Sequence, residues 1–556
     1  MMCKAGWFLR TLCLLQAGLP IAARADVTPT ELTETVKTIA SDPFQGRSPG
    51  TVGEQKTVVY LTERLKALGL MPAGPNGSWT QDVPMIHNVL GTPEKLEATV
   101  AGTIVPLVAG RDIVPMTTRA TDRVSIDKAP LVFVGYGVSA PERDWDDYKG
   151  VDLRGKIAVY LVNDPDFEAK PQDDAYGRFG NKAMTYYGRW VYKYEEATRR
   201  GALGALIIHE TGPAGYGWNV ASNTVVGGVY ALPTDRGQPQ PPALEGWIST
   251  AFASDLFKRA GLDLNALKTQ ARSTGFYPTP IGDARLSFDM PVKSARIVSR
   301  NVLAKIPGRL HPDETILYGA HWDAIGIGAA DAQGRTIHSG ANDDGLGVAG
   351  LLALARAFAQ QPSPERTIAF AFWTAEERGL LGSEYYAAHP VLPLAKTVAN
   401  LTIDTMQTAG LARDVIQIGA GHSNLDADLA VAAAAQDRTV TPDAKPERGL
   451  AYRADHFSFA KRGVPTLLLM GIGGGADLVK GGRAAGDAWV SNYTAHCYHQ
   501  TCDRWDPSWD LHGAAQDVEL FRVIGNKLAN SRQWPTWNPG TEFKAAGDTL
   551  AALRQR

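Results

Sequence analysis

The segment Leu-Tyr-Gly-Ala-His-Trp-Asp occupies residues 317–323, and the segment Gly-Ala-Asn-Asp-Asp-Gly follows at residues 340–345. The mainly apolar run 315–318 predicts a buried strand that ends shortly before His321. The two aspartates of the second segment lie in a glycine-flanked turn before residues 346–358, whose apolar spacing is helical. Open α/β sheets place their sites beyond the carboxyl ends of the strands. A histidine at a strand end and a carboxylate at a helix start therefore predict an α/β fold with a site at that edge.

Further candidate metal ligands stand where other apolar runs stop. One strand-like run ends shortly before Glu376 and Glu377, and another leads directly into Asp404. His499 lies in a loop near the C-terminus. Imidazole and carboxylate groups suit zinc, and a catalytic zinc keeps one position open for water.

Two metal ions fit this set better than one. The candidate ligands are two imidazoles and three carboxylates: His321, Asp343, Glu377, Asp404 and His499. Five ligands are too many for one tetrahedral catalytic zinc, whereas two zinc ions that share a bridging carboxylate and a water would use them all. Each motif alone has an ordinary explanation, since Asp-Asp-Gly is common in turns and Glu-Glu suits a helix start. Their joint occurrence at strand ends favours the metal site.

The same residues carry a family resemblance. The motifs are His321-x-Asp323, Gly-Ala-Asn-Asp-Asp-Gly at 340–345, Trp-x-Ala-Glu-Glu-x-Gly-Leu-Leu-Gly-Ser at 373–383, Asp404 and Tyr498-His499. This ordered set resembles that of the co-catalytic dizinc exopeptidases, a family that includes secreted bacterial leucyl aminopeptidases, glutamate carboxypeptidase and the catalytically inactive transferrin receptor ectodomain. The resemblance implies a three-layer α/β/α core with a mixed sheet and two Zn²⁺ per chain.

The resemblance also assigns a role to each metal ligand. Asp343 would bridge the two zinc ions. His321 and Asp404 would complete one zinc site, and Glu377 and His499 the other. No ligand position is substituted in this sequence, so an inactive ectodomain is the weaker alternative.

Four further residues would take part in the reaction by the same resemblance. Glu376 would be the general base, which accepts the proton of the attacking water and passes it to the leaving amine. Asp323 would orient the ring of the histidine in its own motif. Tyr498 would stabilise the tetrahedral intermediate. Arg453, in a segment where Ala454 replaces the family's usual serine, would lie near the substrate; a surface arginine paired with an acid is the alternative.

The composition is that of an ordinary globular protein. The chain has 556 residues, of which 44% are hydrophobic and 21% charged, so it can build a large core and more than one domain. Its formal net charge is −2, which gives no reason to expect nucleic acid or an anionic membrane as partner.

Residues 1–25 have the features of a secretory signal peptide. Lys4 and Arg10 make the start positive, an apolar stretch follows, and Ala-Arg-Ala at 23–25 is a cleavage pattern. The apolar stretch is too short and interrupted to span a bilayer, and no other segment has a transmembrane character. We therefore expect an exported protein, periplasmic or secreted, that is cleaved near Ala25.

Two of the four cysteines, Cys497 and Cys502, lie outside this signal and flank His499. In an exported protein their spacing permits a small disulfide loop that would brace the histidine. A pair of free thiols or a metal-binding pair is the alternative.

The sequence predicts three parts after the signal. Residues 26–127 form the N-terminal part of the peptidase domain, and residues 286–556 form its catalytic part with a C-terminal extension. Between them, residues 128–285 predict a β-rich insert that resembles the protease-associated domain of secreted peptidases. An unrelated β-rich insert is the alternative.

The expected function is that of an exported zinc-dependent aminopeptidase that acts on peptides. A carboxypeptidase or dipeptidase on the same metal core is the first alternative, and it would need a basic cluster for the substrate carboxylate. A non-catalytic binding ectodomain and an acyltransferase similar to glutaminyl cyclase, with one zinc, are the others. Side-chain preference, native metal and oligomeric state stay open.

Overall fold

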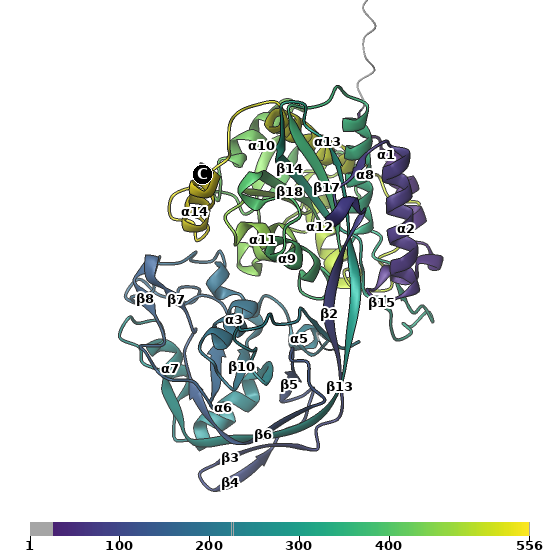
Figure 1. Ribbon diagram of the computed structural model, residues 1–556. Coiled ribbons are helices and arrows are strands. Elements are labelled where there is room, and N and C mark those ends of the chain that lie inside the picture. Colours follow the sequence, from purple (N-terminus) through teal and green to yellow (C-terminus); the bar gives the residue numbers. More distant parts are fainter. Residues whose placement is uncertain (1–25, 224, 226, 555–556) are drawn as a thin grey trace, which may run out of the picture.

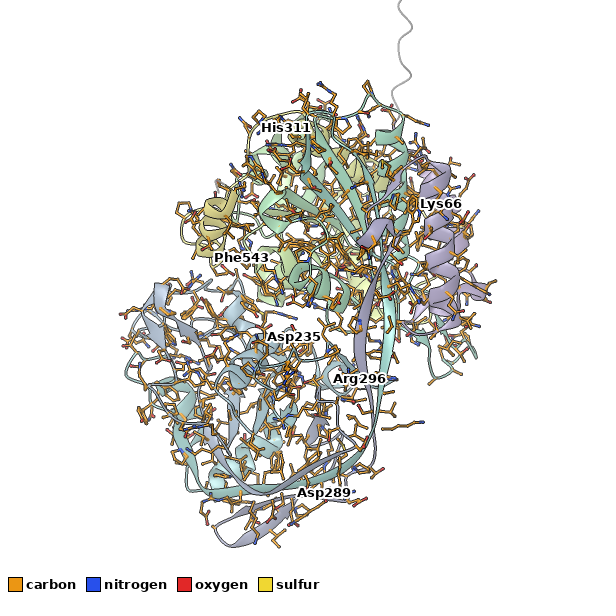
Figure 2. The ribbon with its side chains drawn as sticks, in the orientation of Figure 1. Lys66, Asp235, Asp289, Arg296, His311 and Phe543 are labelled. Carbon is orange, nitrogen blue, oxygen red and sulfur yellow. A yellow bond between two sulfur atoms is a disulfide. The ribbon has the colours of Figure 1, made fainter. Side chains whose placement is uncertain are left out.

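The computed structural model describes residues 26–223, 225 and 227–554, and the predicted signal peptide at 1–25 lies outside the described residues. Figure 1 shows an upper and a lower body that two long strands connect. These are β2 (Thr80–Leu90) and β13 (Thr279–Ile306), which pair antiparallel. Figure 2 shows Asp289 of β13 in the lower body and Arg296 on the connecting stretch. Within the described ranges, no helix is both long enough and apolar enough to cross a membrane.

The upper body is built on a mixed sheet. Beyond β2 and β13, its strands in spatial order are β17 (Arg366–Trp373), β14 (His311–His321), β18 (Thr397–Ile403), β21 (Thr466–Leu469), β19 (Asp414–Ile418) and β20 (Thr439–Pro442). Strands β17, β14, β18 and β21 are parallel, whereas β13 is antiparallel to β17 and β19 to β21. Short β1 (Met71–Pro72) pairs with β13, and β11 (Val229–Ala231) pairs with β2. The mixed α/β sheet predicted from the sequence is confirmed.

Helices cover both faces of this sheet because alternate strand residues point to opposite faces. In β17, Phe370 and Phe372 belong to one hydrophobic core and Ala371 and Trp373 to another. The first core includes residues of α1 (Pro29–Ile39), α2 (Val52–Ala67), α8 (Gly345–Ala359), α10 (Leu425–Ala434) and α13 (His512–Ala529). The second includes residues of α9 (Leu381–Ala388), α11 (His456–Ala460) and α14 (Lys544–Arg554). Each fully buried Leu or Phe contributes about 1.5–3 kcal/mol, so the two cores hold the three layers together.

The lower body is a second mixed sheet with its own helices. Its strands in spatial order are β5 (Ile113–Met116), β12 (Leu244–Ser249), β10 (Gly204–His209), β9 (Ile157–Leu161), β6 (Arg123–Phe133), the first half of β13, β3 (Lys95–Val100) and β4 (Thr103–Pro106). Its helices include α3 (Trp190–Arg199), α4 (Thr211–Ala214), α5 (Trp218–Asn223), α6 (Thr250–Arg259) and α7 (Leu264–Gln270), and β7 (Ser139–Ala140) pairs with β8 (Trp145–Asp146). The insert is therefore α/β, with parallel central strands, and not simply β-rich.

The predicted boundaries of the insert, 128 and 285, are too narrow. Ala98 and Val100 of β3 share a hydrophobic core with Phe288 and Met290 of β13, so the lower body extends beyond both predicted limits. The boundary at 285 also falls inside β13, a single strand of 28 residues that leaves the lower sheet and enters the upper one. A strand shared by two sheets has no loop or change of composition at the crossing point, and the sequence therefore carries no boundary signal there.

Candidate metal centre

Neighbouring parallel strands bring most of the candidate ligands to one edge of the upper sheet. His321 is the last residue of β14, Asp404 directly follows β18, and Glu377 follows β17 on the other side of β14. Asp343 lies in the turn before α8. Parallel strands end at the same edge, which is why residues far apart in the chain converge there.

The five predicted metal ligands form two groups that share Asp343. The first group is His321, Asp343 and Asp404, and the second is Asp343, Glu377 and His499. Within each group the ligand atoms lie within 4.8 Å of one another. Asp343 Oδ1 is 3.2 Å from Nε2 of His321, and Asp343 Oδ2 is 3.2 Å from Nε2 of His499. Each oxygen of one carboxylate thus faces a different histidine, as in a carboxylate that bridges two cations.

A buried oxygen that makes no hydrogen bond supports a cation here. Asp343 Oδ2 makes no hydrogen bond, although the ring nitrogen of His499 is close to it. The same ring nitrogen is 3.1 Å from Oε2 of Glu377. Imidazole nitrogens and carboxylate oxygens that converge in this way are the donor set of zinc sites. The residues present therefore fit the metal that the motifs imply.

The electrostatics of the cluster also favour a bound cation. Burial raises the pKa of Asp404 to about 8, and the nearby Asp343 adds to the rise. Burial raises the pKa of Glu377 to about 7, with His499 acting in the opposite direction. Burying several carboxylates together disfavours their charged forms. A divalent cation would restore those forms, because metal binding requires and stabilises the deprotonated ligand.

Glu376 lies beside the two groups without belonging to either. Its Oε2 is 3.9 Å from Nε2 of His321, and burial raises the pKa of Glu376 well above its ordinary value. The backbone N–H of Glu376 donates to Oδ1 of Asp323 at 3.0 Å. Glu376 thus places its carboxylate next to the candidate ligands, outside both groups, and its backbone is held in place.

Asp323 lies beside both His321 and Glu376. The ring Nδ1 of His321 is 3.1 Å from the backbone oxygen of Asp323 and 3.6 Å from its carboxylate. The carboxylate also accepts the backbone N–H of Glu376. Asp323 therefore links the orientation of the histidine ring to the position of Glu376.

Tyr498 and Arg453 lie at the same centre. The Tyr498 ring stacks on the His499 ring with centroids 3.9 Å apart. Arg453 Nη2 lies 3.5 Å from the Tyr498 hydroxyl. Burial raises the pKa of Tyr498 well above its ordinary value, so its hydroxyl remains protonated and can donate a hydrogen bond.

Two acidic residues whose roles were not predicted support the turn that carries Asp343. Asp344 Oδ2 accepts the backbone N–H of His321 at 3.2 Å, and its Oδ1 accepts the N–H of Gly347 at the start of α8. Asp503 accepts the backbone N–H groups of Asn342 and Asp343 at 2.9 and 3.0 Å. Asp344 was visible in the motif as a helix-start residue, whereas nothing in the local sequence distinguishes Asp503.

Arg47 also holds the centre together. It is fully buried and donates to the backbone oxygens of Ile39, Trp322, Ser339 and Gly340 at 2.7–2.9 Å. The carbonyls of Trp322, Ser339 and Gly340 flank the segments that carry His321 and Asp343, whereas that of Ile39 ends α1. The glycine- and proline-rich loop around Arg47 was the only sequence signal for this role.

A disulfide joins Cys497 and Cys502 on either side of His499. The backbone oxygen of His499 also lies 3.2 Å from Nδ1 of His338, on β16 (Ile337–His338). The disulfide thus joins the two ends of the loop, and the contact with His338 holds its centre.

Comparisons with known proteins agree with this geometry. Residues 301–521 match the family model described as Peptidase family M28. The chain is 30% identical to the probable leucine aminopeptidase 2 of Aspergillus oryzae over 207 aligned residues. This alignment covers 35% of this chain and 39% of that protein. Over 104 residues it is 38% identical to a vacuolar membrane protease of Lodderomyces elongisporus, 18% of this chain and 10% of that protein. These matches span well under half the length of either relative.

The fold has a counterpart among solved structures. The aminopeptidase from Aneurinibacillus sp. strain AM-1 is similar over 92% of this chain and 96% of its own, with a TM-score of 0.51 and 20% sequence identity. This likeness shows a shared fold that extends over both bodies. All five predicted metal ligands lie within the matched range 301–521. The part of the chain that carries the candidate metal centre therefore resembles peptidase family M28.

Proposed function

We propose that this protein is an exported, zinc-dependent aminopeptidase that holds two zinc ions and removes N-terminal residues from peptides. The observation that carries the proposal is the pair of ligand groups that share Asp343, with Glu376 beside them and outside both. The peptidase family of residues 301–521 and the aminopeptidase names of two similar proteins support the reaction class.

Glu376 is the general base in this proposal. When bound, the zinc ions would supply Lewis-acid catalysis to the hydrolysis. Glu376 would accept the proton of the attacking water and deliver it to the leaving amine. Burial raises the pKa of Glu376 above that of an ordinary glutamate, which makes its carboxylate a stronger proton acceptor.

Tyr498 would stabilise the negative charge that develops on the peptide oxygen. Its protonated hydroxyl is a hydrogen-bond donor, and the adjacent Arg453 adds positive charge at 3.5 Å from that hydroxyl. Donors that are already in place before the reaction lower its barrier without a reorganisation cost. Asp323 would hold Glu376 and His321 in fixed positions relative to these donors.

The reaction can be tested with paired peptides, one with a free amino terminus and one acetylated, each with and without a chelator. Chelator-sensitive release of the first residue from only the free peptide is the expected result. Release of the last residue from both peptides would instead identify a carboxypeptidase. Metal analysis of the same preparation should find two zinc ions per chain; one per chain would favour the acyltransferase alternative, and none, together with no turnover, a binding ectodomain.

Export and the nature of the insert belong to the same proposal. A disulfide within the chain is typical of proteins from oxidising compartments, which supports export. We assign the lower body a role like that of a protease-associated domain, next to the metal centre. Mass spectrometry of the protein recovered from the periplasm or medium should give an N-terminus near Asp26, and an intact Met1 would contradict the proposed cleavage.

A further inference from the structure

Arg189 brings a positive charge from the lower body to the metal centre. It directly precedes α3 and is 9% exposed. The segment around it lies against the upper body, where the backbone N–H of Met184 donates to the oxygen of Pro446 at 3.1 Å. The Cδ atom of Arg189 would be 3.3 Å from a Cβ placed on Gly449. Its side chain therefore packs against the loop that leads to Arg453.

The charge of Arg189 has no partner in the described chain. Its guanidinium makes neither an ion pair nor a hydrogen bond with any residue between 26 and 554 that the structure describes. Its nitrogens are also not among the polar atoms that are closed off from solvent and lack a partner. The nitrogens therefore border space that water or a ligand can reach. The contrast with other buried arginines is clear, since Arg47 meets four backbone oxygens and Arg366 pairs with Glu314. A guanidinium that borders solvent and has no partner among the described residues is available to an anionic ligand.

Two more arginines gather at the same place. Burial lowers the pKa of Arg189 to about 10, and the positive charge of Arg453 lowers it further, so both groups remain charged and lie close together. Arg448 also interacts with Arg453 and donates to the backbone oxygen of Ile472 at 3.2 Å. We refer to Arg189, Arg448 and Arg453 as the arginine cluster. Tyr216 of the lower body interacts with both Arg189 and Arg453, which places it beside the cluster.

The arginine cluster borders the reacting groups. Arg453 reaches the Tyr498 hydroxyl and interacts electrostatically with Glu376 and Asp404. Arg189 lies on the side of Arg453 that belongs to the insert. Two neighbouring guanidinium groups can bind one anion together, and a guanidinium binds a carboxylate with two parallel hydrogen bonds.

We propose that Arg189 and Arg453 bind a carboxylate of the peptide substrate, so that the enzyme prefers short peptides with a carboxylate next to the bond that is cleaved. The proposal rests on the peptidase function proposed above and names its substrate class. The carboxylate could be the C-terminus of a dipeptide or the side chain of an acidic residue in the second position. In either case the insert supplies a specificity-determining residue to a centre formed by the upper body.

The experiment compares matched substrates of the metal-loaded full-length enzyme. Leu-Ala against Leu-Ala-amide measures recognition of the C-terminal carboxylate, and Leu-Asp-amide against Leu-Asn-amide measures recognition of an acidic side chain. Leu-p-nitroanilide, which has no carboxylate, reports the peptidase reaction itself. We expect at least one of the charged substrates to exceed its neutral partner roughly tenfold or more in kcat/KM, mainly through KM.

The variants then assign the preference to Arg189. In Arg189→Gln the ratio between charged and neutral substrates should fall towards one, and Arg189→Lys should recover part of it. Arg154→Gln, at an exposed arginine of the same body, is the matched control and should keep the wild-type ratio. Melting temperatures separate binding from folding, because removal of an unpaired buried charge should not lower the melting temperature.

Each outcome decides the proposal. A wild-type ratio of about one for both substrate pairs overturns it, and so does a ratio that Arg189→Gln leaves unchanged. Turnover of the anilide with no discrimination would remove the carboxylate site and keep the peptidase. No turnover of any substrate by the zinc-loaded protein would overturn both proposals together.

Discussion

The carboxylate of Asp503 accepts the backbone N–H of Asp343 at 3.0 Å, although the two residues are 160 positions apart in the chain. The same carboxylate accepts the N–H of Asn342 and the hydroxyl of Tyr493. The carboxylate that the two candidate ligand groups share is thus held in place through its own backbone, and its position depends on a loop near the C-terminus.

Asp503→Asn should weaken metal binding. The amide retains one acceptor oxygen and places an NH₂ group against a backbone N–H, so one of the two backbone hydrogen bonds is lost. Loss of a group that supports a ligand typically lowers metal affinity about 10- to 100-fold. Titration with a chelator measures the change. Asp506→Asn, at an exposed position nearby, is the control; equal affinities in the two variants would contradict the role of Asp503.

Glu376→Gln should retain the fold and the metal and lose turnover. The amide cannot accept the proton of the attacking water, and loss of a general base lowers kcat roughly 100- to 10,000-fold. Glu377→Gln should instead lower the metal content, because Glu377 belongs to a ligand group. Steady-state kinetics and metal analysis of both variants distinguish the two roles. Near-normal turnover in Glu376→Gln would exclude Glu376 as the base.

Arg47→Gln should destabilise the upper body. The substitution removes most of the donors that serve four buried carbonyl oxygens, and each unsatisfied buried group costs about 1–3 kcal/mol. We expect a loss of several kcal/mol in the free energy of unfolding of this body, measured with denaturant. Arg64→Gln, at an exposed position on α2, should change stability little. A stable Arg47→Gln variant would show that the carbonyls find other donors.

Replacing both cysteines, as in Cys497→Ser with Cys502→Ser, should loosen the loop that presents His499. The cross-link restricts the conformations of the loop before metal binds. Without it, the loop loses conformational entropy when it binds metal, and this loss weakens binding. We expect faster loss of metal to a chelator, with the group that contains His499 affected first. Reduction of the wild-type protein should have the same effect. Unchanged metal retention in both experiments would assign the disulfide to general stability only.

The stability of the lower body should fall as the pH rises from about 4.5 to about 7. Burial raises the pKa of Glu245, on β12, from 4.5 to about 7. Within this window the folded state keeps a proton that the unfolded chain has released, so folding loses stability with rising pH. Denaturant unfolding at pH 5 and pH 8 should show the loss, and Glu245→Gln should reduce it. If Glu245→Gln had the same pH dependence of stability as the wild type, a buried, protonated Glu245 would be contradicted.

Much of the candidate metal centre was predictable because its candidate ligands stand next to local signals. The continuous apolar run of β17 and the strand that ends at His321 are visible in the sequence, and their polar end residues follow at once. The shared Asp343 precedes a helix whose apolar spacing is equally local. The convergence of these ligands followed from one general rule about parallel strands.

The sequence by itself indicated the main strands of the catalytic part, the helix after Asp343 and the candidate ligands at the strand ends, because periodicity and strand ends are properties of neighbouring residues. Only the tertiary structure decided that β13 crosses both bodies, that Asp503 holds Asp343, and that Arg189 of the insert lies near Arg453. The physical reason is that these relationships join segments far apart in the chain. They depend on strand register and on the contact between two bodies, and neither leaves a pattern in the adjacent residues.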